Sequence, residues 1–110
     1  MKVGGIHIAA LPQADGVNKL RPVAVLAQFR KHGDFLVCGI STQLQSADPD
    51  IDVVVDEGAD DFRDTGLRQT SVLRLSHLFT IPKDRFRGRI GFLTEQRIHH
   101  LRQRLARFLG

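Results

Sequence analysis

The fold is decided by residues 19–43, which read KLRPVAVLAQF (19–29), RKHGD (30–34) and FLVCGISTQ (35–43). The first and third runs are rich in Val, Leu, Ile and Phe, and the polar run between them contains Gly33. Apolar runs separated by a short segment with Gly are typical of two antiparallel strands joined by a turn. The sequence therefore predicts a β-hairpin.

The register of this hairpin determines which side chains meet at its open end. We expect Phe29 to face Phe35 across the turn, which brings Arg21 opposite Gln43. Cross-strand neighbours lie about 5 Å apart at Cβ, so one cation would lie beside a Ser-Thr-Gln cluster. The same register pairs Val25 with Gly39 and Val23 with Ser41.

Arg21 is well placed to bind an anion. Pro22 disfavours a helical conformation in the residue before it, and proline is tolerated at the start of a strand. The five donors of a guanidinium suit a phosphate, and hydroxyl and amide groups can complete the contact. The alternative is an arginine at a strand end that makes a surface ion pair.

The remaining apolar runs predict further short strands. These strands are Val3–Leu11, Ile51–Val55, Thr70–Leu75, Leu78–Ile81 and Arg89–Leu93. Asp52 and Asp56 form an acidic outer edge of the second one, Gly58–Asp64 reads as a solvated acidic loop, and Lys83–Phe86 reads as a turn or one helical turn. Many short strands punctuated by Gly and Pro indicate a mainly β fold, a compact barrel or sandwich.

The C-terminal segment predicts one amphipathic helix. Thr94 is a suitable N-cap, and Glu95 is favourably placed at the positive end of the helix. Apolar side chains follow at helical spacing, at Ile98, Leu101, Leu105 and Leu109. The other face carries Arg97, His99, His100, Arg102, Arg104 and Arg107. This basic face is either solvated or meets RNA or an acidic partner.

Composition limits the protein class. A chain of 110 residues is large enough for one domain with its own core. The only cysteine, Cys38, excludes an intrachain disulfide and fits a small core residue in a reducing cytoplasm. We expect neither a signal peptide nor a membrane span, because there is no charged-then-apolar leader and no long uncharged apolar run.

Charge is distributed unevenly along the chain, whose formal net charge is +4. Residues 48–64 hold eight of the twelve acids and one base, and the rest holds fifteen bases and four acids. A basic body of this kind attracts polyanions, of which nucleic acid is the commonest. No His, Cys and carboxylate set has the spacing of a metal site, so we expect no cofactor.

Several motifs together resemble one protein family. KLRPVAVL, ISTQ, GLRQTSVLRL, LFTIPKD and GRIGFLTEQ follow in this order, with a closing helix, between Lys19 and Gly110. This pattern resembles the MazF/PemK toxins of bacterial toxin–antitoxin pairs. It departs from them at Gly4-Gly5, where family members commonly carry Gly-Asp. The resemblance implies that residues 1–110 form a single toxin domain, a small SH3-like barrel of short antiparallel strands with a C-terminal amphipathic helix.

The resemblance also implies a function. Toxins of this family are endoribonucleases that cleave single-stranded RNA without a metal, leave a 2′,3′-cyclic phosphate, and inhibit translation and growth in the cytoplasm. They form homodimers and bind a cognate antitoxin. By motif position the catalytic arginine falls on Arg21 and the catalytic threonine on Ser41. Thr42 would take that role if a bulge shifts the register.

Substrate contacts follow from the same resemblance, at Lys19, Thr42, Gln43, Ser71, Arg74 and His77. Arg74 matches a second arginine of the PemK-like branch. Where that branch carries an acid two residues later, this chain has Ser76 and then His77, so either the acid's role is lost or His77 supplies a titratable group. His7 is another candidate proton acceptor, or a half-exposed strand histidine.

Two other functions stay open from the sequence. A gyrase-poisoning toxin of the CcdB type would present an aromatic residue at its extreme C-terminus, whereas this chain ends Phe108-Leu109-Gly110 and has no Trp. A barrel that only binds RNA or a protein would need no Arg–Ser geometry.

Overall fold

The structure is a computed structural model that describes residues 1–110. Six strands form one antiparallel sheet in the order β4-β5-β3-β2-β1-β6. The strands are β1 (Gly5–Pro12), β2 (Asn18–Gln28), β3 (Phe35–Ser41), β4 (Val53–Val55), β5 (Ser71–Ile81) and β6 (Phe86–Phe92). The helices are α1 (Phe62–Thr65) and α2 (Glu95–Leu109), with short 3₁₀ turns η1 (Leu44–Ser46) and η2 (Lys83–Arg85).

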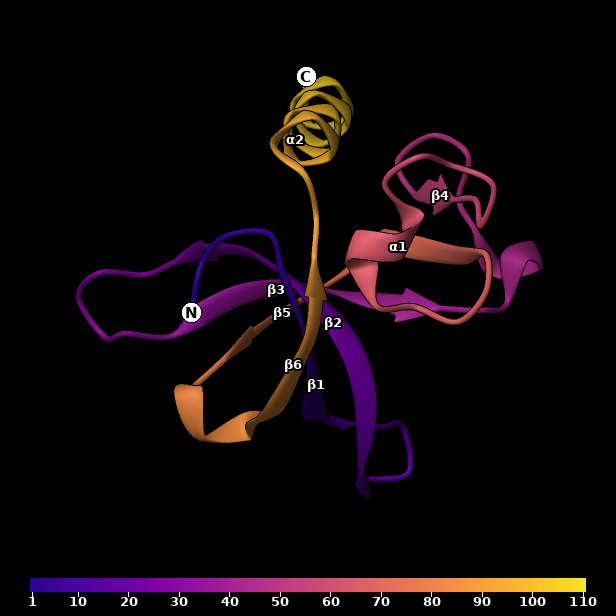
Figure 1. The fold of residues 1–110 in the computed structure, drawn as a ribbon. Helices are drawn as coiled ribbons and strands as arrows, with labels where there is room; N and C mark the ends of the chain where they lie inside the picture. The colour runs from indigo at the N-terminus through magenta and orange to yellow at the C-terminus, as the bar shows by residue number, and fades with distance from the viewer.

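The mainly β fold with a C-terminal helix is therefore confirmed, but the barrel is not closed. Strands β4 and β6 are the two edges of the sheet and do not pair with each other. In Figure 1, α2 is seen almost along its axis at the top of the view, and α1 and β4 lie to its right. The helix and this segment thus lie on the same side of the molecule, away from the β1–β2 turn.

The hairpin is present, but its predicted register is wrong by two positions. Val23 pairs with Gly39 and Val25 with Val37. Two local features cause the shift. Phe29 bonds to Asp34 rather than facing Phe35, around a turn closed by Gly33 with a positive φ of 74°, and Leu26 is an extra residue that interrupts the ladder.

The sheet buries apolar side chains on both of its faces. One cluster joins residues such as Ala24, Cys38 and Leu73 to Leu101 of α2. The second cluster lies on the other face and includes Val23, Val25 and Phe35. The alternation of side chains along a strand explains this division, because neighbouring residues of β2 point to opposite faces. Cys38 is fully buried as expected, and its burial raises the pKa of the thiol to about 12.

Two predicted strands merge into the single strand β5, which contains a wide bulge. Cys38 of β3 pairs with Leu78, and the next residue, Gly39, pairs with Arg74. Residues 75–77 are therefore left without partners on β3. The acidic segment also differs from the predicted loop, since it contains α1, which ends at Gly66 in a left-handed conformation with φ 71°.

Helix α2 agrees with its prediction. The Thr94 hydroxyl accepts a hydrogen bond from the Arg97 N–H at 3.2 Å, and Leu101 is buried. The basic face is not wholly solvated, because Arg97 pairs with Asp61 and Arg104 donates to the backbone carbonyl oxygens of Pro49 and Asp52. No helix is long and apolar enough to cross a membrane.

Candidate active site

A cavity of about 450 Å³ lies where the start of β2, the end of β3 and the bulge of β5 come together. It adjoins the second apolar cluster, since Leu11 and Phe79 belong to both. The lining residues are Leu11, Gln13, Arg21, Pro22, Gly39, Ile40, Ser41, Thr42, Gln43, Arg74, His77 and Phe79. The cavity thus collects most of the polar residues that the sequence singled out.

The two arginines of the cavity have no acidic partner. The chain forms one ion pair, between Arg97 and Asp61, and it lies elsewhere. Arg21 is exposed, and the only hydrogen bond of its side chain is a long one of 3.5 Å to the Leu20 carbonyl oxygen. Arg74 is half-buried, and its Nε is buried without a hydrogen-bond partner. A buried donor without a partner costs about 1–3 kcal/mol, and neither arginine is neutralised by a carboxylate.

Two hydroxyl groups lie at the end of β3. The Ser41 Oγ accepts a hydrogen bond from the Gln43 N–H at 3.0 Å, which closes a short turn. The Ser41 O–H proton is left free to donate. Thr42 is exposed and also lines the cavity, so the structure presents both hydroxyl groups to a ligand.

The bulge of β5 presents His77 to the same cavity. Leu75 turns into the first apolar cluster, whereas His77 is exposed and lines the cavity. Between them, Ser76 donates its N–H and its hydroxyl to the Asp52 carboxylate, both at 2.9 Å. A bulge commonly re-aims a side chain next to a functional site, and here a buried carboxylate holds it.

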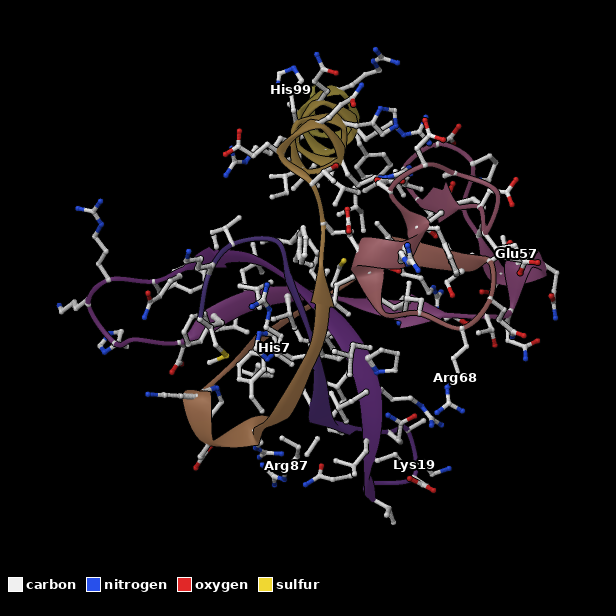
Figure 2. The ribbon with its side chains drawn as sticks, viewed as in Figure 1. His7, Lys19, Glu57, Arg68, Arg87 and His99 are labelled. Atoms are coloured by element: carbon white, nitrogen blue, oxygen red, sulfur yellow. The ribbon has the colours of Figure 1, made fainter.

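Three sequence candidates lie outside the cavity. Lys19 is exposed on β2, where it pairs with Leu11, and Figure 2 shows it at the end of the molecule opposite His99 of α2. Ser71 is buried and donates its hydroxyl to the Gln69 carbonyl oxygen at 2.8 Å. His7 is buried, where desolvation and then the charge of Arg89 lower its pKa.

The sequence did not single out several residues that line or support the cavity. Gln13 and Leu11 come from β1 and the loop that follows it, and Gly39 leaves open space because its position lacks a side chain. Asp52 was expected on an acidic outer edge, which is wrong, since it is only 5% exposed. Because Asp52 alternates with Ile51 and Val53, it looks like an exposed strand residue, and its contact with Ser76 could not be predicted. A strand pattern does not reveal that a distant helix packs at this point, where Arg104 of α2 donates to the Asp52 carbonyl oxygen.

The structure has no group of three or more His, Cys, Asp or Glu side chains that is placed to hold a metal ion. The permanently charged side chains that line the cavity are Arg21 and Arg74.

An open antiparallel sheet with an arginine-lined cavity at the end of a hairpin, covered on one face by a C-terminal helix, defines the class of protein. Residues 2–109 match the family model of the PemK-like, MazF-like toxins of type II toxin–antitoxin systems. The chain belongs to this family.

A solved structure supports the same assignment. The fold is similar to that of Mycobacterium tuberculosis toxin MazF-mt6, with a TM-score of 0.71 and 29% sequence identity over 96% of this chain and 95% of that one. No curated protein matches the sequence at a significant level.

Proposed function

We propose that this toxin is an endoribonuclease that cleaves single-stranded RNA without a metal and so inhibits translation and growth. The observation that carries the proposal is the cavity itself, in which two arginines without acidic partners lie with the hydroxyl groups of Ser41 and Thr42. Family membership supports the same function. The basic composition outside residues 48–64 would draw a polyanion towards the protein.

The residues support cleavage by the RNA's own 2′-hydroxyl. Its oxygen attacks the adjacent phosphorus, and negative charge develops on the phosphoryl oxygens. Arg21 and Arg74 stabilise that charge, because hydrogen bonds from guanidinium groups to phosphoryl oxygens are charge-assisted and strengthen as the negative charge develops. The Ser41 hydroxyl donates a hydrogen bond to the leaving 5′-oxygen, since its proton is free. The products are a 2′,3′-cyclic phosphate and a 5′-hydroxyl end.

The test is direct. Purified protein is incubated with a long mRNA in excess chelator, and the cut ends are mapped and their chemistry determined. We expect cuts at defined positions that carry cyclic phosphate and 5′-hydroxyl ends. Intact RNA that is nevertheless bound would indicate a non-catalytic RNA-binding protein. Activity lost in chelator and restored by magnesium would contradict the metal-free mechanism.

The proposal includes partners. We expect the toxin to act as a homodimer in the cytoplasm with RNA across the joint surface, because the open sheet has unpaired edges that can be covered by a second copy. A cognate antitoxin would use acidic residues against the basic surface. Light scattering at micromolar concentration should give the dimer mass, and expression without the antitoxin gene should arrest growth.

A further inference from the structure

The cavity contains no carboxylate that could accept a proton. Its lining has three residues with basic side chains, Arg21, Arg74 and His77, and no Asp or Glu. Arginine keeps its proton in proteins and therefore cannot act as a base. A histidine ordinarily changes protonation near neutral pH. His77 is thus the lining residue suited to take up a proton and release it again.

The bulge in β5 is what brings His77 to this place. An unbroken ladder would place residues 75–77 opposite β3, but these residues have no partners there. His77 lies beside Gly39 of β3, where an added Cβ would be 4.0 Å from the His77 Cβ and would touch nothing closer. The absence of a side chain at Gly39 therefore leaves space next to His77, and both residues line the cavity.

Asp52 holds the bulge in this shape. Its Oδ1 accepts the Ser76 N–H and its Oδ2 accepts the Ser76 hydroxyl, both at 2.9 Å. The same Oδ2 accepts the Asp48 N–H at 2.8 Å, and Arg104 of α2 donates to the Asp52 carbonyl oxygen at 3.0 Å. The carboxylate thus gives the Ser76 N–H a partner that β3 does not supply, and the backbone of Asp52 is anchored to the helix through Arg104.

We propose that His77 accepts the proton of the RNA 2′-hydroxyl, and that Asp52 is the positioning residue that aims it by bonding to Ser76. This inference rests on the proposed RNA cleavage and adds the general base that the reaction needs. Asp52 cannot serve as that base itself, because it is buried and bonded to Ser76.

The 2′-oxygen forms a bond to phosphorus while its proton passes to the imidazole of His77. The bond from phosphorus to the 5′-oxygen breaks, and that oxygen, which accepts a hydrogen bond from the Ser41 hydroxyl, takes its proton from water. The imidazolium then returns its proton to the solvent, which regenerates the enzyme. No atom is oxidised or reduced.

The charges that face His77 determine the pH dependence. Arg21 faces the cavity from β2 and Arg74 from β5, and β3 contributes no charged side chain to the lining. Both arginines stay cationic at the pH values used, so they keep the charge that faces His77 constant. A reaction that needs an unprotonated general base loses rate in acid, so we expect kcat/KM to rise with pH and then reach a plateau.

The first experiment measures cleavage of an oligonucleotide spanning one mapped cut, from about pH 5 to about pH 9. The His77→Gln variant should lose about 10²- to 10⁴-fold in kcat. It should also lose the acidic limb of the pH profile, which is the fall in rate towards low pH. Imidazole added to His77→Ala should restore part of the rate. The control is His99→Gln, because His99 is exposed on the outer side of α2 (Figure 2) and should keep the wild-type profile.

The outcomes separate this inference from the proposed function. A wild-type protein that cleaves RNA, with His77→Gln retaining both its rate and its acidic limb, overturns the role of His77 and leaves the proposed function intact. A wild-type protein that binds but never cleaves RNA overturns both. Affinity of His77→Gln for an uncleavable 2′-deoxy analogue should equal that of the wild type, because the loss lies in kcat.

A second experiment tests the positioning role. Ser76→Ala removes only the hydroxyl bond to Asp52, so the variant should fold, lose kcat at nearly constant KM, and retain the acidic limb. Asp52→Asn should lose more, whereas Asp50→Asn on the same loop should behave as wild type, since no hydrogen bond involves its side chain. Ser76→Ala and Asp52→Asn variants with wild-type kcat would overturn the positioning role.

Discussion

The carboxylate of Asp61 accepts two hydrogen bonds from the guanidinium of Arg97, one from Nε at 2.9 Å and one from an Nη nitrogen at 2.8 Å. This contact joins the acidic segment before α1 to the first turn of α2. Together with the Arg104 contacts it withdraws two cations from the basic helix face. Part of the acidic segment, residues 48–64, thus neutralises part of the basic helix face within the same chain.

The Asp61–Arg97 pair should contribute measurably to stability. We expect Asp61→Asn to lower the free energy of unfolding by about 1 kcal/mol at neutral pH. The bonds from Arg97 lower the pKa of Asp61, so the contribution is complete above the ordinary value of about 4 and is lost as pH falls through the folded-state value. Urea unfolding at neutral and acid pH measures this difference. Asp60→Asn is the control, and an equal loss there would contradict the assignment.

Burial of His7 should make the protein less stable in mild acid. Its folded-state pKa is lowered, so the unfolded chain binds the proton more readily, and stability falls as pH drops below about 6.5 until the folded-state value is reached. We expect His7→Gln to show a flatter dependence of unfolding free energy on pH in this range. His32→Gln, in the exposed hairpin turn, should keep the wild-type slope.

Filling the space at Gly39 should separate activity from stability. A Cβ added there meets nothing closer than the His77 Cβ at 4.0 Å, so Gly39→Val should fold with an unchanged or slightly raised melting temperature. RNA cleavage should fall at least about 10-fold, because the new side chain occupies the cavity. The control is Gly88→Val, since a Cβ added at Gly88 has no atom within 4 Å and Gly88 does not line the cavity. Loss of cleavage in both variants would point to a general effect.

Arg21 should act through its planar contact with phosphate rather than through charge alone. Arg21→Lys keeps the charge but not the two-pronged geometry, so we expect cleavage to fall about 10²- to 10³-fold while RNA binding is largely kept. Binding measured with an uncleavable analogue separates the two effects. Arg30→Lys, in the turn at the other end of the hairpin, should cleave normally.

The two hydroxyl residues can be told apart by single substitutions. We expect Ser41→Ala to lower the cleavage rate about as much as Arg21→Lys, because it removes the hydroxyl whose proton is free to donate. Ser41→Thr keeps a hydroxyl group, so it should retain or raise the cleavage rate. Thr42→Ala should have a smaller effect. The reverse ranking would assign the donor role to Thr42, and normal cleavage in all three alanine or lysine variants would place the site elsewhere.

Local patterns were sufficient to predict most of the elements. The hairpin, the capped helix that begins after Thr94 and the helical turn Lys83–Arg85 depend on apolar spacing, capping and Pro or Gly signals. These are properties of neighbouring residues, and they act whatever the rest of the chain does. The same patterns brought Arg21 and Ser41 together as candidates despite the wrong register, because both lie at the same end of one hairpin.

The sequence by itself determined which residues could do the chemistry, and the tertiary structure decided which of them meet. The bulge at Leu26, the bulge that aims His77 and the open edge between β4 and β6 depend on contacts between distant strands. The burial of Asp52 is of the same kind, since its partner Ser76 comes from β5. Such pairs are formed only when the sheet assembles, because their energy arises from contacts across the fold and not from the local pattern of either segment.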